Sequence, residues 1–438
     1  MQLSRGQTAV LIAAGVLFLV TVGALTQVAN ISSLWSQPQD DISPAEADRL
    51  AANVSPVLVD GTNTFGYQLF SQLRATRNDT NTFISPFSIA TALAMAYNGA
   101  AGQTRQEMAQ VLNVGNLSRQ TVNQEFDQLI TALDHVSPEV ELALANSLWL
   151  HSGLNEVSQS FIDRLEQSYD AGVFRRDFRD PATVTAINDW VNRTTDGMIK
   201  QLIDKIKPSE ILFLLNAIHF KARWSSTFDR EDTEQEPFTT PSGNVTVPMM
   251  HQNERFEVLA RDKFKAIRLP YGGGDTAMYV FLPDRNSSLN EFMDQLTPAQ
   301  LQNYTDWFSQ PWMKERAVEL SMPRFKVEYG TVLLNDQLKA LGMETAFDRA
   351  RANLDDMLPR EEAFISRVMH KAVIQVDEKG TEAAAATGVA VGNKSALLTR
   401  NTFHVDRPFF FTIQDDRTDQ ILFMGTVTNP AAAKDQQQ

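Results

Sequence analysis

The chain has 438 residues, of which 43% are hydrophobic and none is cysteine. This composition allows a large buried core, and the lack of cysteine excludes disulfides, cysteine nucleophiles and thiolate metal sites. Lys and Arg number 39 against 53 Asp and Glu, and the formal net charge of -14 argues against electrostatic capture of nucleic acid, heparin-like polyanions or acidic lipid. We therefore expect a globular protein stabilised by packing.

Residues 1–29 contain an uncharged, mostly apolar run, 8–28, that would be long enough to cross a bilayer as a helix. Arg5 before this run predicts that the N-terminus stays inside and that the rest of the chain lies outside. Residues 22–24 form an acceptable signal cleavage site, so a cleaved signal peptide and a retained membrane anchor both remain open. Either predicts an extracytoplasmic protein, and the anchor would tether it to the membrane.

Residues 30–56 are rich in Ser, Gln, Asp, Pro and Ala with little periodicity, which predicts a linker before a folded domain over 57–438. Helical spacing of apolar residues predicts helices at 63–76, 88–98, 106–112 and 122–133. Alternating or continuous apolar runs predict strands at 140–150, 211–220, 256–259, 266–269, 277–282, 317–322, 372–376 and 409–413. This order lacks βαβ alternation and favours an α+β domain with large antiparallel sheets.

The sequence contains no recognisable catalytic or metal-binding motif. None of the 6 histidines belongs to a His-Glu-x-x-His motif, and no nucleophile elbow, phosphate loop or dinucleotide fingerprint occurs. We therefore expect a protein that is not an enzyme and that requires neither a metal nor a cofactor.

The segment over 377–408, between two predicted strands, is far longer than the about 4–6 residues that usually connect elements. Helix propensity would make 382–386 a short helix, but glycines bound that run closely. With a period of two, 381–391 instead places only small or β-branched side chains on one face. Such a strand could enter an existing sheet without displacing its neighbours, so the segment suits both an exposed loop and a new central strand.

Several segments resemble the serpin family of serine protease inhibitors. Residues 377–387 read DEKGTEAAAAT, similar to the hinge of inhibitory serpins, and residues 403–411 read FHVDRPFFF, similar to the C-terminal signature of the family. Further similar segments occur in the expected order at 81–95, 215–224, 247–250 and 369–373. The resemblance covers roughly 57–430 and implies a serpin fold, with about nine helices around three β-sheets and an exposed reactive centre loop at about 378–404.

The resemblance also implies site residues. The hinge corresponds to Glu378, Gly380, Thr381, Glu382, Ala383, Ala384, Ala385, Ala386 and Thr387. The polar cluster that latches the central sheet, called the shutter, corresponds to Ser85, Ser88, Asn216 and His370. Trp224 corresponds to the tryptophan of the breach, the end of the sheet where insertion begins, although plain core packing explains it equally well.

In inhibitory serpins the residue before the scissile bond usually lies about fourteen positions after the hinge glycine, which implies Lys394 followed by Ser395. A lysine there implies a trypsin-like serine protease as partner, held as a covalent acyl-enzyme while 380–393 insert into the sheet. Arg400 is the alternative residue before the scissile bond, and it would make the inserting segment longer. The implied protein is a monomeric, metastable inhibitor, and activation by a polyanion is not expected because Arg105 and Arg119 stand among acidic residues.

A serpin-fold binding or chaperone protein that never inserts its loop is the alternative. The small, uncharged hinge argues against it, because bulky residues or proline are expected where insertion has been abandoned.

Overall fold

The computed structural model describes residues 42–76, 79–169, 171–381 and 401–432, and these described residues form one compact unit. The predicted signal or anchor over 1–29 and most of the predicted loop lie outside the described residues. Among the described helices, none is both long and apolar enough to span a membrane. The helices are α1 Pro44–Asn53, α2 Pro56–Ala75, α3 Pro86–Gly99, α4 Gly102–Val111, α5 Arg119–Asp134, α6 Gln159–Tyr169, α7 Ala182–Thr194, α8 Leu289–Gln295, α9 Pro298–Asp306 and α10 Asn335–Ala340. The strands are β1 Thr82–Ile84, β2 Val140–His151, β3 Gly172–Arg176, β4 Leu212–Arg223, β5 Glu234–Thr240, β6 Gly243–Ala260, β7 Phe264–Tyr271, β8 Thr276–Pro283, β9 Arg316–Pro323, β10 Phe325–Glu328, β11 Val332–Leu333, β12 Arg367–Asp377, β13 Gly380–Thr381, β14 Asn401–His404, β15 Phe409–Asp415 and β16 Gln420–Val427.

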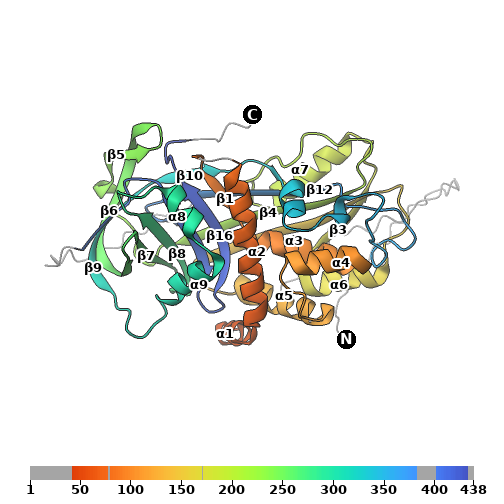
Figure 1. Ribbon diagram of the computed structural model, residues 1–438, viewed down its shortest axis with the longest axis horizontal. Helices are drawn as coiled ribbons and strands as arrows, with labels where there is room; N and C mark the ends of the chain where they lie inside the picture. The colour runs from red at the N-terminus through yellow and green to blue at the C-terminus, as the bar shows by residue number, and fades with distance from the viewer. Residues whose placement is uncertain (1–41, 77–78, 170, 382–400, 433–438) are drawn as a thin grey trace, which may run out of the picture. The chain divides into compact units, whose positions relative to one another are not determined.

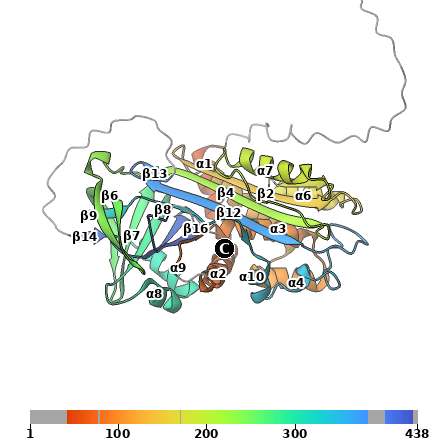
Figure 2. The same cartoon turned by 90° about the horizontal axis from the view of Figure 1, so that it is seen from above.

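A seven-stranded sheet forms one layer, in the order β10-β12-β13-β4-β2-β3, with β11 paired to β12. Its central strand β4 is almost entirely buried and β12 is buried at seven of its eleven residues, because α3 packs on β4 from one face and α7 lies over the neighbouring β2 on the other (Figure 2). The face under α7 has its own apolar core, with Trp149, Trp190 and Phe213 among its members. Burial on both faces explains why the predicted strand at 211–220 is continuously apolar.

The remaining nine strands follow the order β1-β16-β15-β8-β7-β6-β9-β14, with β5 paired to β6. The 18-residue strand β6 pairs with β7 through 257–260 and with β9 through 249–256, so it joins two smaller sheets. Together with the seven-stranded sheet they make the three sheets expected from the sequence, and the described residues hold ten α-helices against about nine expected.

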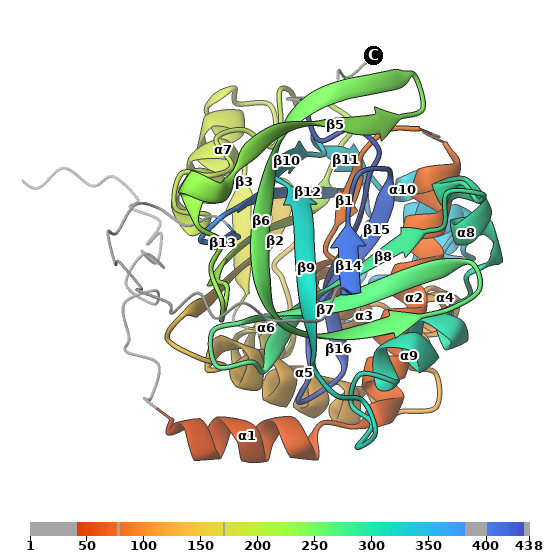
Figure 3. The same ribbon diagram turned by 90° about the vertical axis from the view of Figure 1, so that its left-hand side faces the viewer.

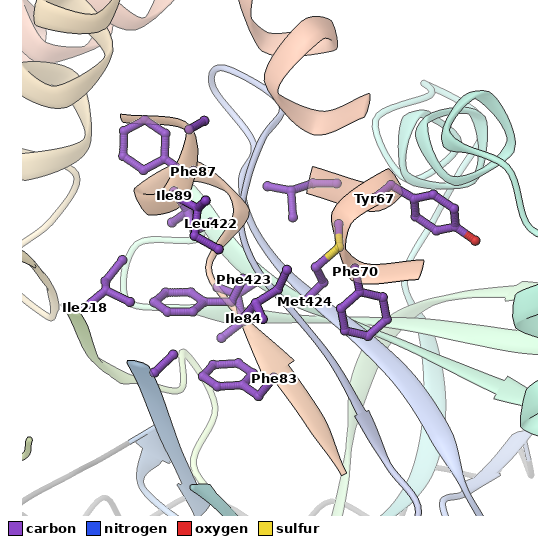
Figure 4. Close-up of a cluster of buried hydrophobic side chains, with 14 of the residues drawn as sticks. Tyr67, Phe70, Phe83, Ile84, Phe87, Ile89, Ile218, Leu422, Phe423 and Met424 are labelled. Atoms are coloured by element: carbon purple, nitrogen blue, oxygen red, sulfur yellow. The ribbon is translucent and has the colours of Figure 1, made fainter. Parts of the chain in front are cut away.

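The main core lies where α2 and α3 pack on β16 and β4 (Figure 1). Every residue of α3 is buried, so this helix is apolar on all sides rather than amphipathic. Ser85 begins it as N-cap, accepting a hydrogen bond from the Ser88 N–H, and Pro86 occupies the first turn. Figure 4 shows Phe83, Ile218 and Phe423 converging beside this helix start, so the polar N-cap sits inside an apolar core.

The predicted linker over 30–56 is corrected in its second half. Residues Pro44–Asn53 form α1, which packs on α5 and buries Ala47, Ala51 and Val54, so the folded unit begins at Ile42 rather than at Val57. The inward face of α1 consists mainly of alanine, which gives almost no periodic hydrophobic signal. Its contacts with α5 supply the stabilisation that so short a helix lacks on its own.

Candidate functional site: the opening between β4 and β12

The central sheet is open at one end. Over most of their shared length β4 and β12 pair directly and in parallel, from Phe213 opposite Arg367 to Ile218 opposite Ala372. Beyond this ladder the two strands separate and β13 lies between them, antiparallel to both. Two residues of the predicted loop, Gly380 and Thr381, therefore already form a short strand inside the sheet.

Gly380 permits this entry because it has no side chain. It sits opposite Arg223 of β4, and a Cβ built on it would lie 2.0 Å from the carbonyl oxygen of Ala222. Real Cβ atoms do not approach a backbone atom so closely, so any larger residue would force β13 away from β4.

Thr381 is completely buried, and its hydroxyl is 2.6 Å from the Tyr271 hydroxyl. Burial raises the pKa of Tyr271, which keeps its phenol protonated and able to donate or accept this hydrogen bond. A small polar residue is therefore matched to this position by a specific partner on β7.

Trp224 stacks on Tyr271 with ring centroids 4.3 Å apart and an interplanar angle of 9°. Its indole N–H donates to the Asp377 carbonyl over 3.0 Å, and its backbone N–H donates to the Lys379 carbonyl over 2.9 Å. The tryptophan thus holds the turn that leads from β12 into β13, in addition to filling the core.

Glu378 fixes the same turn from the other side. Its carboxylate forms an ion pair with Arg324 and accepts a hydrogen bond of 2.8 Å from the Thr233 hydroxyl. Desolvation alone would raise the pKa of Glu378, but the hydrogen bonds from Arg324 and Thr233 outweigh it and hold the pKa below its ordinary value. The residue is therefore ionised at neutral pH.

The four predicted shutter residues meet in one buried network. The Asn216 side-chain amide donates to the Ser88 carbonyl over 2.9 Å, and its oxygen accepts from His370. The Nε2 atom of His370 accepts the Ser85 N–H over 3.2 Å, so the ring proton resides on Nδ1. His370 and Asn216 are also directly opposed in the β4–β12 ladder, so separating the two strands breaks a hydrogen bond between them.

Burial lowers the pKa of His370 to about 3, since no charged partner compensates for its complete removal from water. The imidazole is neutral at physiological pH and serves as one donor and one acceptor in the network.

Comparison with known proteins identifies the family to which the chain belongs. The family model described as serpin, serine protease inhibitor, matches residues 60–430. The chain is a member of the serpin family. An uncharacterised serpin-like protein of Thermococcus kodakarensis is 35% identical, with 90% of this chain and 92% of that protein covered. Leukocyte elastase inhibitor A of Rattus norvegicus is 31% identical, with coverages of 85% and 99%. Among solved structures, the thermophilic serpin tengpin in its native state matches with a TM-score of 0.78 and 30% identity, covering 86% of this chain and 95% of tengpin.

The structure of this serpin adds site residues that sequence reasoning missed. Asn146 of β2 accepts a hydrogen bond from Asn216 over 2.5 Å, while Tyr271, Arg324 and Thr233 hold β13 and its turn. Asn146 carried a usable signal, because it interrupts the leucines that occupy alternate positions of its strand. The other three lie on distant segments and carried none.

The rest of the predicted site lies outside the described residues. These positions are the hinge from Glu382 to Thr387, the reactive bond Lys394–Ser395 and the alternative Arg400. The described chain resumes at β14, which pairs in parallel with β9 of the other sheet, so the predicted loop connects β13 in one sheet to β14 in another.

Proposed function

We propose that this serpin is a single-use inhibitor of a trypsin-like serine protease, cleaved between Lys394 and Ser395 and trapping the protease as residues 380–393 insert between β4 and β12. The observation that carries the proposal is β13, which already occupies the first two positions of that path and has the antiparallel orientation that a full-length inserted strand would need.

Insertion beyond Thr381 would replace the parallel β4–β12 ladder by two antiparallel ladders. Antiparallel pairing is slightly stronger per residue, and an inserted segment of about twelve residues would add roughly ten or more hydrogen bonds at about 1 kcal/mol net each. This gain is comparable to the whole stability of an ordinary domain, so the uncut serpin would be a kinetically trapped state of higher free energy.

The shutter supplies the barrier in this mechanism. The inserting strand must separate His370 from Asn216, and those side chains then need new partners in a fully buried environment. The strands β4 and β12 therefore separate only when the inserting loop can take the place between them.

The chemical step belongs to the protease. Its serine oxygen attacks the Lys394 carbonyl, an ester forms, the peptide bond to Ser395 breaks, and the new amine of Ser395 leaves with its proton. Hydrolysis of the ester by water would release cleaved inhibitor. Insertion must carry the tethered protease away, and distort its catalytic site, faster than that hydrolysis.

The test is a mixture of the serpin with trypsin, analysed on a denaturing gel. We expect a covalent complex larger than either partner, lost in Lys394→Ala and retained in Arg400→Ala. A complex retained by Lys394→Ala and lost in Arg400→Ala would move the reactive bond to Arg400. Cleaved serpin without any complex would refute the inhibitor proposal and favour the binding protein that does not insert its loop.

We also propose that the serpin domain acts outside the cytoplasm, delivered by residues 8–28. The apolar character of that run supports the proposal. N-terminal sequencing of the mature protein distinguishes cleavage near Ala24 from a retained anchor, and recovery of the intact domain from the cytoplasm would refute it.

A further inference from the structure

A pocket of about 390 Å³ is lined in part by the neighbouring strands β9 and β14, which lie side by side facing the viewer in Figure 3. Residues of β6, β7, β9 and β14 line it, together with the segment that follows α9. The pocket lies in the nine-stranded sheet and contains no residue of the β4–β12 opening.

Two tryptophans form an aromatic wall in this pocket. Trp307 and Trp312 meet edge to face with centroids 5.6 Å apart, and the guanidinium carbon of Arg261 lies 3.2 Å from the centroid of Trp307. Trp312 is 57% exposed, among the largest exposures of a bulky apolar side chain in the described residues. An exposed indole beside an aromatic–cation stack offers a flat surface to a ring-containing ligand.

Three cations, Arg261, Lys265 and Arg316, line the same pocket, and none of them forms an ion pair within the described part of the chain. The Nη2 atom of Arg261 is buried and lacks a hydrogen-bond partner there. An unsatisfied buried guanidinium nitrogen is costly, and a movement of the Arg261 side chain that exposes this nitrogen to the pocket would let an anionic oxygen remove that cost.

Two of the neighbouring carboxylates are paired with cations outside the pocket. Glu315 precedes Arg316 in the chain but pairs with Arg255, and Glu257 lies two residues before Leu259 of the pocket wall but pairs with Arg268. The chain has a net charge of -14, but the three unpaired cations around this aromatic pocket make the pocket locally positive.

We propose that this pocket binds a small aromatic anion, an aryl or fused-ring carboxylate or sulfonate, with its rings against Trp307 and Trp312 and its acidic group on Arg261 and Arg316. A polyanion fits less well, because the cations surround a bounded hollow instead of forming an extended stripe. Asn401 and Thr402 of β14 also line the pocket, so the ligand would contact the strand that follows the predicted reactive loop.

The probe is 8-anilinonaphthalene-1-sulfonate, measured by its fluorescence and by calorimetric stoichiometry on the intact serpin. We expect one site per chain, an affinity weakened about tenfold or more in Trp312→Ala and in Arg316→Gln, and weak binding of the uncharged analogue N-phenyl-1-naphthylamine. Arg349→Gln removes an exposed cation that does not line the pocket and should leave the affinity unchanged.

Both test residues are largely solvent-exposed, and unfolding curves of each variant check that the fold is intact. Equal binding of the charged and uncharged probes, or the same affinity in both pocket variants as in the wild type, would overturn the proposal. It would also be overturned if a sulfated oligosaccharide bound in a manner sensitive to Arg316→Gln while the small sulfonate did not bind.

Discussion

Thr381 is the residue at which the described hinge meets the closed part of the central sheet. Its side chain is fully buried against Tyr271, beside the Trp224 stack. Under the proposed function, we predict that Thr381→Arg turns the serpin into a protease substrate, because a guanidinium at this position would have to be buried without a carboxylate partner. Trypsin should then cut the variant and release it, with covalent complex on a denaturing gel reduced at least about tenfold.

Thr381→Ser is the matched control, since it keeps the hydroxyl that meets Tyr271 and remains small. It should form complex at nearly the wild-type yield. Trapping by Thr381→Arg at an undiminished yield would show that the hinge does not enter the sheet by the path of β13.

His370 gives the shutter a pH dependence. Its pKa is about 3 in the folded state and near 6.5 when unfolded, so the unfolded chain holds more protons between these values. The His370 contribution to the free energy of unfolding is therefore complete above pH 6.5. It is lost progressively as the pH falls toward 3, by about 1.4 kcal/mol per pH unit.

Urea unfolding of wild type and His370→Gln between pH 4 and 6 measures this contribution as a difference of slopes. Burial raises the pKa of Asp416 and Asp419 to about 6, which favours the folded state as the pH falls, but both residues remain in each protein and cancel. Wild type should lose stability more steeply with falling pH than the variant. Equal slopes would contradict this prediction, because they would mean that the pKa of His370 is nearly the same in the folded protein as in the unfolded chain.

At the scale of the element, β13 depends on the close approach of Gly380 to β4. We predict that Gly380→Ala expels this two-residue strand, because the new Cβ cannot lie 2.0 Å from the Ala222 carbonyl oxygen. Amide hydrogen exchange over 377–381 should become at least about tenfold faster, while the β2–β4 ladder keeps its protection.

Gly273→Ala is the control, since its new Cβ would meet nothing closer than 4.0 Å. It should leave exchange over 377–381 unchanged. Unaltered exchange in Gly380→Ala would mean that the end of the sheet widens easily, and the glycine requirement would then fail.

At the scale of the whole molecule, the proposed function requires that the uncut fold stores free energy. We predict that cutting within 389–400, by a protease that is not trapped, raises the thermal midpoint by about 10 °C or more, because the freed arm can complete the sheet. Differential scanning calorimetry of cut and uncut protein measures the shift. The cut Thr381→Arg variant should show little gain, and a similar gain in that variant would assign the stabilisation to something other than insertion.

The sequence by itself determined the serpin family, the α+β fold class, and eight of the sixteen strands and four of the ten α-helices in the described residues, because long apolar runs and the segments 81–95, 377–387 and 403–411 carry local, position-specific signals. Comparison with known proteins confirmed the family and the fold. The sequence also selected four polar residues, Ser85, Ser88, Asn216 and His370, that the structure brings together.

Only the tertiary structure decided the rest. That Gly380 and Thr381 already lie inside the sheet depends on the separation of β4 from β12 and on Tyr271, Arg324 and Thr233, which come from three distant segments. The helix at Pro44–Asn53 likewise exists because α5 covers its alanine face. Contacts between residues far apart in the chain leave no periodic trace in either segment, so no local pattern could have predicted them.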